Sequence, residues 1–234
     1  MGRVDFRDRH VVVTGGTGAL GKAVVNALIE AGAVCHVPYR SEQDAGASLG
    51  RPNVNLVQTG DLAEEAAVAR VFEAAPRLWA SIHVAGGFAF GALAQASASD
   101  LRAQIDMNLL TCLLCCRAAV RAISATGQGG RIVNVAARPA LEWRQGAKMV
   151  AYTAAKAAVA ALTVALAEEV AREDILVNAV APSIMDTPAN RRDMPKADHG
   201  AWPKVEDVAR TIVFLASPEN RVTRGAVVPV YGRS

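Results

Sequence analysis

Short apolar runs alternate along the chain with longer segments in which apolar residues recur at helical spacing. The short runs are rich in Val, Ile and Ala and predict seven strands, at residues 10–16, 33–40, 54–61, 79–87, 130–137, 175–182 and 225–232. The longer segments predict helices at residues 20–33, 63–75, 100–124, 150–173 and 204–217. Nearly continuous apolar strands that alternate with helices are typical of a parallel sheet covered on both faces. We therefore expect an α/β fold with a doubly wound, seven-stranded parallel sheet flanked by helices.

One segment shows neither pattern. Residues 183–203 are rich in Pro, Asp and Arg and have no clear period. A stretch of this length without a period, inside a compact domain, is typical of a mobile lid over a binding site. Because no linker, repeat or low-complexity segment interrupts the rest, we expect one domain over residues 1–234, with a substrate lid at 183–203.

Composition narrows the classes of function. Of the 234 residues, 52% are hydrophobic and only 5% aromatic, which suits a large aliphatic core. The 25 basic and 22 acidic residues are interleaved and leave a net charge of +3, so a nucleic-acid partner is not expected. We find no run of about 18 uncharged apolar residues that predicts a membrane span, and the first ten residues do not resemble a signal peptide. These features favour a cytoplasmic protein with a small-molecule substrate.

Three of the four cysteines lie in one predicted helix, and the fourth is Cys35. Adjacent Cys115 and Cys116 point in different directions on a helix, and no histidine or second Cys-x-x-Cys pair lies near Cys112 in the sequence to complete a zinc site. We expect all four to pack as small apolar residues, with no metal centre.

A glycine-rich turn follows the first predicted strand. In "VVVTGGTGALGKAV", the pattern Gly16-x-Gly18-x-x-Gly21 lies between a strand and a helix. Glycines let the backbone approach a pyrophosphate, and the helix N-terminus supplies amide donors and a positive dipole. A second strand follows the helix, as in the first unit of a Rossmann fold, so the turn predicts a dinucleotide-binding domain.

The end of the second strand bears on the choice of cofactor. An acid there would bind a ribose 2′-hydroxyl and favour NAD, but the first acid is Glu42. Arg40 and Ser41 precede it, and Arg40 can pair with a 2′-phosphate, so NADP is preferred over NAD. The alternative is that Arg40 is an ordinary surface arginine. Asp61 ends the third strand and can either contact the adenine or cap the next helix.

Tyr152 and Lys156 are four residues apart on a predicted helix and therefore share one face. A tyrosine with a pKa of about 10 is a poor base near pH 7, and a neighbouring ammonium group lowers that pKa. The pair therefore predicts a proton-transfer site. The alternative is a chance meeting on an amphipathic helix.

With these pieces in order, nearly the whole chain resembles the short-chain dehydrogenase/reductase family. "TGGTGALG" is similar to the family's cofactor turn, "GDL" to its adenine contact and "HVAGG" to its Asn-Asn-Ala-Gly stretch, with His83 and Val84 in place of the asparagines. Asn108 resembles the family's helix asparagine, and Tyr152-x-x-x-Lys156 its catalytic pair. "VNAVAPSIMDTP" resembles the segment that closes over the nicotinamide.

The resemblance implies roles for these residues. Tyr152 would be the acid/base, Lys156 would lower its pKa and bind the nicotinamide ribose, and Asn108 would hold a water between Lys156 and solvent. His83 would lie near the adenine side. The implied cofactor-binding set is Gly15, Gly16, Thr17, Gly18, Ala19, Leu20, Arg40, Ser41, Asp61, Leu62, Ala85, Gly86, Gly87, Tyr152, Lys156, Pro182, Ser183, Ile184 and Thr187.

One family feature is missing. Ala137 stands where most members have a catalytic serine, and the interval from it to Tyr152 is longer than usual. A narrower likeness to the dihydropteridine reductases, carried by "VAGGFAFG" and "SIMDTPANRRDMPKADHGAW", is consistent with this alanine. Losing one donor to a substrate oxygen costs about 10²–10³ in rate in other enzymes. Either the substrate needs less help, or Arg138 or another group replaces the serine, or activity is weak.

The other candidate substrate-pocket residues are Trp143, Met149 and Trp202. For each of them, a role in packing alone is an equal alternative.

We therefore expect an NAD(P)H-dependent oxidoreductase that transfers a hydride to or from a carbonyl or quinonoid group. The alternatives are a 3-oxoacyl-type carbonyl reductase and a cofactor-binding scaffold or redox sensor with little catalysis. The helices at 100–124 and 150–173 are apolar on more than one face, which predicts a homodimer or homotetramer. The apolar residues that exceed the needs of one sheet face are Leu109, Leu110, Leu113, Leu114, Val159, Leu162 and Leu166.

Overall fold

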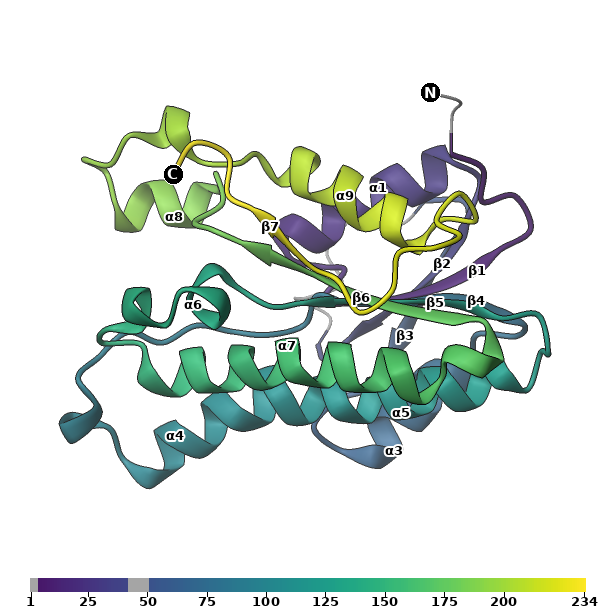
Figure 1. The fold of residues 1–234 in the computed structure, drawn as a ribbon, viewed down its shortest axis with the longest axis horizontal. Helices are drawn as coiled ribbons and strands as arrows, with labels where there is room; N and C mark the ends of the chain where they lie inside the picture. Colours follow the sequence, from purple (N-terminus) through teal and green to yellow (C-terminus); the bar gives the residue numbers. More distant parts are fainter. Residues whose placement is uncertain (1–3, 42–50) are drawn as a thin grey trace.

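A computed structural model describes residues 4–41 and 51–234, and Figure 1 shows its fold. A single sheet of seven parallel strands runs through the molecule in the order β3-β2-β1-β4-β5-β6-β7. The predicted doubly wound, seven-stranded parallel sheet is confirmed. The strands are β1 (His10–Thr14), β2 (Val34–Tyr39), β3 (Val54–Gln58), β4 (Leu78–His83), β5 (Gly130–Val135), β6 (Ile175–Pro182) and β7 (Val227–Val230).

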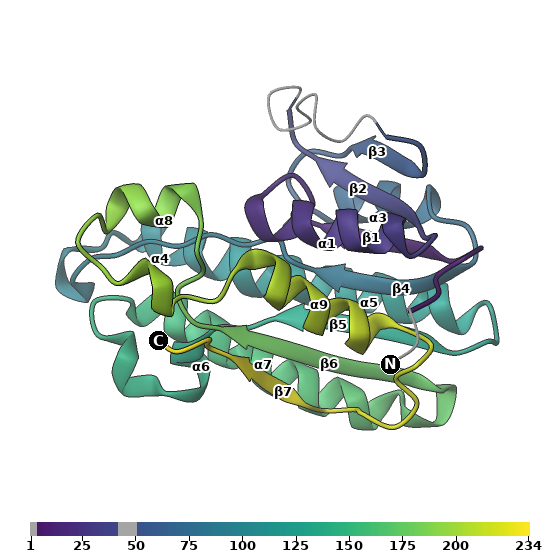
Figure 2. The same cartoon turned by 90° about the horizontal axis from the view of Figure 1, so that it is seen from above.

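Helices cover both faces of the sheet (Figures 1 and 2). One face carries α1 and α9, which pack against each other, and the other carries α3, α5 and α7, with α4 continuing beyond the sheet. Two short helices, α6 and α8, lie beyond the carboxyl ends of the strands. The helices are α1 (Ala19–Glu30), α3 (Glu65–Glu73), α4 (Ala98–Ile105), α5 (Thr111–Ser124), α6 (Arg138–Leu141), α7 (Val150–Glu169), α8 (Pro188–Asp193) and α9 (Val205–Ala216).

Strand alternation divides the apolar residues between two cores. Val11 and Val13 of β1 point to the α1 and α9 face, and Val12 points to the α3, α5 and α7 face. All three side chains are fully buried, which explains why this strand has no polar position in its centre.

The segment expected to be an irregular lid contains ordered structure. Thr187 caps α8 through its side chain, and Pro188 occupies the first helical turn, where its missing N–H costs nothing. The guanidinium group of Arg191 binds both carboxylate oxygens of Asp186, at 2.5 and 2.8 Å. The sequence prediction missed α8 because a helix of six residues is too short to establish a period.

Two helices are long and apolar enough, by length and composition, to cross a membrane: 98–124 and α7. In this fold α5, which is the second half of 98–124, and α7 pack against one face of the sheet. Only 39% and 33% of their apolar windows are buried within the chain. Leu114 and Val159, which we expected to be surplus, belong to the core, whereas Leu113 is exposed.

Candidate active site

A cleft of about 840 Å³ opens along the carboxyl ends of the strands. Parallel strands that fan to opposite sides from the centre of a sheet leave a crevice at this edge, here between β1 and β4. Most of the predicted cofactor and catalytic residues line it. They are Gly15, Thr17, Gly18, Ala19, Leu20, Arg40, Asp61, Leu62, Ala85, Gly86, Gly87, Asn108, Tyr152, Lys156, Pro182, Ser183 and Thr187. Three predicted residues, Gly16, Ser41 and Ile184, are not part of the lining.

Glycine is required at different positions of the first turn for different structural reasons. Gly15 has a φ of +65°, and a side chain there would meet the backbone of Ala85 at 2.7 Å. A side chain on Gly21 would run into the carbonyl oxygen of Gly15, so α1 can approach the turn only with glycine at that position. Gly18 has more room, because its nearest obstacle lies at 3.4 Å. The missing side chain of Gly18 therefore leaves space in the cleft rather than relieving a clash.

Arg40 follows β2 directly and lies exposed on the lining of the cleft. Asp61 lines the cleft from the loop after β3, and its Oδ1 accepts the N–H of Ala63 at 2.9 Å. Asp61 therefore holds its own loop while facing the cleft. It does not cap α3, which begins after Glu64 without a side-chain cap, and contact with an adenine stays a prediction. Glu42 lies outside the described residues.

Tyr152 and Lys156 lie one turn apart near the start of α7, and both line the cleft. The ring of Phe88 meets that of Tyr152 edge to face, with centroids 5.2 Å apart. Lys156 is almost fully buried, and its Nζ donates to the carbonyl oxygen of Val135 at 2.8 Å. This bond ties α7 to the end of β5 and fixes the ammonium group at the floor of the cleft.

Burial dominates the electrostatics of this pair. Desolvation raises the pKa of Tyr152 to about 12 and lowers the pKa of Lys156 to about 8. The Tyr152 shift is opposite to the one expected from the sequence. The physical reason is that Lys156 directs its ammonium group to Val135, so the loss of water around the phenol outweighs the attraction of the cation.

Asn108 lies in a π-helical segment, Asp106–Leu110, that interrupts the helix predicted over 100–124. Its Nδ2 donates to the carbonyl oxygens of Gly87 and Gln104, at 2.9 and 3.0 Å, and its Oδ1 accepts the N–H of Gly87 at 3.2 Å. A side chain on Gly86 would lie 2.7 Å from Oδ1 of Asn108 and 3.4 Å from Nζ of Lys156. Such local π-helical turns are frequent at functional sites. Asn108 thus holds the floor of the cleft together through direct backbone contacts.

Ala137 lines the cleft at the end of β5 and is buried. Arg138, the nearest candidate to replace a serine, does not line the cleft. Its Nε donates to Glu142 at 2.8 Å, and its guanidinium lies over the ring of Tyr231, 4.8 Å from the centroid. The start of α6 directs this side chain away from the cleft, so Arg138 does not supply the missing donor.

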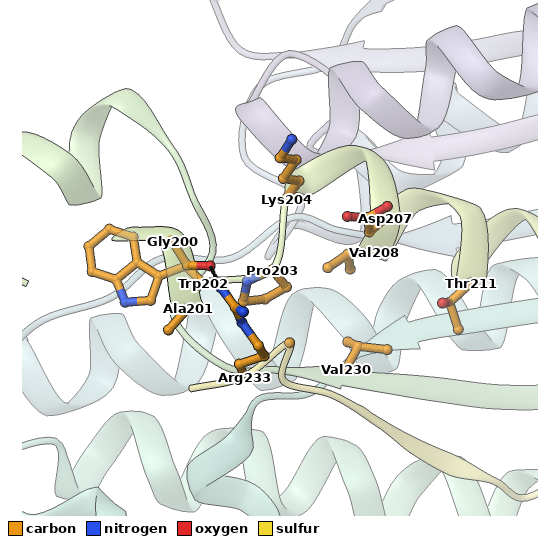
Figure 3. A pocket seen from close by; sticks show the side chains of 11 residues that line it. Gly200, Ala201, Trp202, Pro203, Lys204, Asp207, Val208, Thr211, Val230 and Arg233 are labelled. Carbon is orange, nitrogen blue, oxygen red and sulfur yellow. Dashed lines mark hydrogen bonds between the residues drawn. The ribbon is translucent and has the colours of Figure 1, made fainter. Parts of the chain in front are cut away.

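The remaining predicted substrate-pocket residues also lie outside the lining. Trp143 is 74% exposed, and its indole N–H donates to Ala140 at 3.0 Å. Met149 precedes α7 and is partly buried. Trp202 lines a separate pocket of about 400 Å³ beside α9 (Figure 3), where Arg233 donates to the carbonyl oxygen of Gly200 at 3.0 Å. Family position alone does not determine which way these side chains point.

Several lining residues were not foreseen. Phe88, Met107 and Asp106 come from the loop after β4 and from the π-helical segment, and Met185 and Asn190 come from the segment 183–203. Phe88 is 58% exposed although it touches Tyr152. The signal in the sequence was the pair of aromatic residues in "GGFAFG", directly after the fourth predicted strand. The sequence offered no way to choose between Phe88 and Phe90.

His83, which we expected near the adenine side, does not line the cleft. Ser81 and His83 point to the same face of β4, toward α5, because strand positions two apart share a face. His83 is buried, and its Nδ1 lies 2.8 Å from Oδ1 of Asn134 and 3.5 Å from Sγ of Cys116. The sequence did not predict this contact, because no histidine lies near the cysteines along the chain. The fold brings His83 to them on the face of the sheet that α5 covers.

Comparisons with known proteins agree with this geometry. The sequence profile of the short chain dehydrogenase family matches residues 9–198. The chain is 34% identical to galactitol 2-dehydrogenase from Rhizobium johnstonii, over 94% of this chain and 93% of that protein. It is 32% identical to the 3-oxoacyl-[acyl-carrier-protein] reductase of Homo sapiens, over 96% and 97%.

A further relative is the (2S)-[(R)-hydroxy(phenyl)methyl]succinyl-CoA dehydrogenase subunit BbsD of Thauera aromatica, 30% identical over 97% of this chain and 96% of that protein. A solved structure of a short-chain type dehydrogenase/reductase from Mycobacterium ulcerans superposes with a TM-score of 0.90 at 26% identity, covering 98% of this chain and 90% of that one. Fold, cleft and sequence together lead to one conclusion: the chain belongs to the short-chain dehydrogenase/reductase family of NAD(P)-dependent oxidoreductases.

Proposed function

We propose that this enzyme uses NADPH to reduce a carbonyl or quinonoid group of a small, largely apolar substrate, with Tyr152, Lys156 and Asn108 as its catalytic set. The observation that carries the proposal is one continuous cleft, in which the Gly15–Leu20 turn and the Tyr152–Lys156 pair are part of the same lining. A cofactor that reached from the turn to the tyrosine would therefore fill this cleft.

The chain fits a dinucleotide. Gly18 leaves room for a pyrophosphate against the N-terminus of α1, and Asp61 and Leu62 line the far end of the cleft. Arg40, exposed on that end, is the cation that would bind a 2′-phosphate, which supports the preference for NADP over NAD. When bound, the nicotinamide cofactor supplies or accepts the hydride.

Tyr152 gives its phenolic proton to the substrate oxygen. A pKa of about 12 keeps the phenol protonated at neutral pH, which suits proton donation and hence reduction. Lys156 donates one of its three protons to Val135, and its remaining donors are free to bind ribose hydroxyls. Asn108 keeps the Gly86–Gly87 backbone clear of the ammonium group.

Ala137 and Phe88 favour a particular substrate class. With alanine at the end of β5, the substrate oxygen has one hydrogen-bond donor fewer than in most family members. A conjugated or quinonoid group spreads its developing charge and needs less of that help. The exposed ring of Phe88 beside Tyr152 gives a flat aromatic substrate a surface to stack on.

Two structural features accompany this function in our proposal. The segment 183–203, which includes α8, closes over the substrate, because Ser183, Thr187 and Asn190 line the cleft. The exposed apolar faces of α4, α5 and α7 join copies of the chain into a homodimer or homotetramer, as Leu113 and Val164 are 40% and 47% exposed. Light scattering that gave only the monomer mass would contradict the second point.

The test is turnover of NADPH with a panel of ketones, quinones and quinonoid pterins. Replacing Tyr152 by Phe should lower kcat by about 10²–10⁴ while cofactor binding is retained, because only the proton is lost. Tyr231→Phe is the matched control, since Tyr231 stacks on Arg138 outside the cleft. Unchanged activity in Tyr152→Phe, or binding of NADPH without turnover of any compound, would contradict the proposal.

A second candidate is a 3-oxoacyl-type reductase. The relatives include proteins named 3-oxoacyl-[acyl-carrier-protein] reductase from Homo sapiens and Rattus norvegicus, 32% and 30% identical to this chain. Ala137 counts against it, because an isolated ketone gains most from the missing hydroxyl. Faster turnover of a 3-oxoacyl thioester than of any quinonoid compound would select this alternative.

A further inference from the structure

A compact group of soft ligand atoms lies inside the domain, between the sheet and α5. Cys112 and Cys116 are one turn apart on α5, and His83 reaches them from the end of β4. The two sulfurs and a ring nitrogen of His83 all lie within 4.8 Å of one another. None of the three side chains is more than 4% exposed. The fold has therefore gathered three metal-ligand side chains from two elements in a place that water does not reach.

A fourth ligand atom completes the arrangement. Oδ1 of Asn134, on β5, lies 2.8 Å from Nδ1 of His83 and 3.4 Å from the sulfur of each cysteine. Thr163 fixes the direction of this amide: its hydroxyl donates to Val159 at 2.8 Å, so it must accept from Nδ2 of Asn134, at 3.0 Å. The carbonyl oxygen of Asn134 is thereby directed at the cysteines and the histidine.

Without a cation this arrangement is poorly matched. The two thiols and the ring N–H of His83 all lie within hydrogen-bond distance of Oδ1 of Asn134, although a carbonyl oxygen has only two lone pairs. The remaining contacts of these groups are with one another, such as that of Cys116 with His83 at 3.5 Å. A cation at the centre would instead be bound by all four groups at once. Buried polar groups that share one partner in this way call for an explanation.

The distances suit a tetrahedral ion. With metal–sulfur and metal–nitrogen bonds of about 2.3 and 2.0 Å, a tetrahedral site separates sulfur from nitrogen by roughly 3.6 Å and sulfur from oxygen by roughly 3.5 Å. The corresponding distances here are 3.5 Å for Cys116 to His83 and 3.4 Å for each cysteine to Asn134. The contact of His83 with Asn134, at 2.8 Å, must widen, and the atoms of Cys112, Cys116 and His83 already lie within 4.8 Å of one another.

The surroundings of His83 match those of a metal ligand. Its second ring nitrogen, Nε2, lies 2.8 Å from Oγ of Ser81, which can accept the remaining N–H and leave Nδ1 unprotonated for a cation. Ligating histidines nearly always have such an outer partner, which fixes both the tautomer and the ring.

We propose that His83, Cys112, Cys116 and Asn134 form a closed site for one Zn²⁺ ion, independent of the cofactor cleft. Two thiolates neutralise the charge of the ion, so no net charge is buried. The ion would connect β4, β5 and α5 one helical turn beyond Asn108, and its role would be to stabilise the packing of these elements. None of these four side chains belongs to the proposed catalytic set, so the metal site can be tested independently of the proposed reaction.

The test measures the metal directly. Protein produced with zinc present should carry about one equivalent by elemental analysis, and removal of the ion should lower the Tm. Cobalt added to the stripped protein should give the intense visible bands of tetrahedral Co²⁺ and a thiolate-to-cobalt charge-transfer band in the near ultraviolet. Absence of these bands in folded wild-type protein would overturn the proposal, as would a Cys112–Cys116 disulfide in freshly purified, metal-free protein.

Variants locate the ion. Cys116→Ala and His83→Asn should each weaken metal binding by more than the roughly 10–100-fold that loss of an outer partner costs, and Ser81→Ala should fall within that range. Cys115→Ala is the matched control, because Cys115 is equally buried on the same helix but belongs to no cluster of ligand atoms in the described part of the chain. Equal loss of the cobalt bands in Cys115→Ala and Cys116→Ala would place the ion elsewhere and overturn the assignment. If Cys116→Ala does not fold, His83→Asn and the wild-type spectrum decide.

Discussion

Asn108 holds the backbone of Gly87 from both ends of its amide: Nδ2 donates to the carbonyl oxygen at 2.9 Å, and Oδ1 accepts the N–H at 3.2 Å. The same amide reaches back to Gln104, at 3.0 Å, across the π-helical segment. Asn108 therefore connects the loop after β4 to the long helix, and the floor of the cleft depends on this one side chain.

Asn108→Ala should leave the partly buried backbone groups of Gly87 and the buried carbonyl group of Gln104 without this partner. Each such group costs about 1–3 kcal/mol, so the free energy of unfolding should fall by about 2 kcal/mol or more. Chemical denaturation measures that loss, and kcat should fall with it as Gly86 moves toward Lys156. Asn108→Asp keeps the acceptor but not the donor and should lie between Ala and wild type. Equal stability of Asn108→Ala and wild type would show that these bonds do not hold the loop.

Two glycines of the first turn should respond differently to alanine. Gly21→Ala places a methyl group against the carbonyl oxygen of Gly15, a backbone atom that cannot rotate away, so the Tm should drop. Gly18→Ala meets nothing closer than 3.4 Å, so the Tm should change little while NADPH affinity falls. Thermal unfolding and cofactor titration separate the two effects. Equal losses of affinity and of stability in both variants would contradict this distinction.

Arg40 should determine the choice of cofactor. Arg40→Gln removes the cation at the adenosine end of the cleft, so KM for NADPH should rise about tenfold or more, as expected for a charge-assisted pair of 1.5–3 kcal/mol. KM for NADH should change far less, because NADH has no 2′-phosphate. Steady-state kinetics with both cofactors provide the comparison. Equal changes for both would mean that Arg40 is a surface residue without a phosphate partner.

Ala137→Ser should restore a hydroxyl at the end of β5. Ala137 lines the cleft, so the added oxygen has space on that side. We expect a gain of about 10²-fold in kcat/KM for simple ketones, in line with the worth of one donor to a developing oxyanion, and little change for quinonoid compounds. The ratio of the two activities is the measurement. A gain of the same size for both classes would argue against charge delocalisation as the reason for the alanine.

His36 should make stability depend on pH. It stacks on His10 with ring centroids 5.2 Å apart, and burial, followed by the charge of His10, lowers the pKa of His36 to about 4. Between pH 6.5, its pKa in the unfolded chain, and pH 4, the unfolded chain binds a proton that the folded chain does not. The free energy of unfolding should therefore fall as the pH drops through this window. His36→Leu should reduce that slope in urea titrations, and an unchanged slope would assign it to other groups.

Much of the fold was predictable because its determinants are local. The apolar runs of β1 to β7 and the periodic segments between them are contiguous in the chain, and near-continuous apolar strands require cover on both faces. The glycine turn and the Tyr152–Lys156 pair are fixed in the same way, by spacing within one turn and one helix. The interruption of the helix predicted over 100–124 was not predictable. The π-helical segment there contains Asn108, whose side chain binds Gly87, 21 residues away.

The sequence by itself determined the order of the elements, the glycine-rich turn and the spacing of the candidate proton donor and its lysine, because each depends on residues that are neighbours in the chain. Only the tertiary structure decided where side chains point across the sheet. It places the guanidinium of Arg138 over the ring of Tyr231, away from the cleft, and directs Lys156 to Val135. It also brings His83 to Cys112 and Cys116. These relationships arise when strands and helices that are distant in sequence pack face to face, and no local pattern encodes that direction.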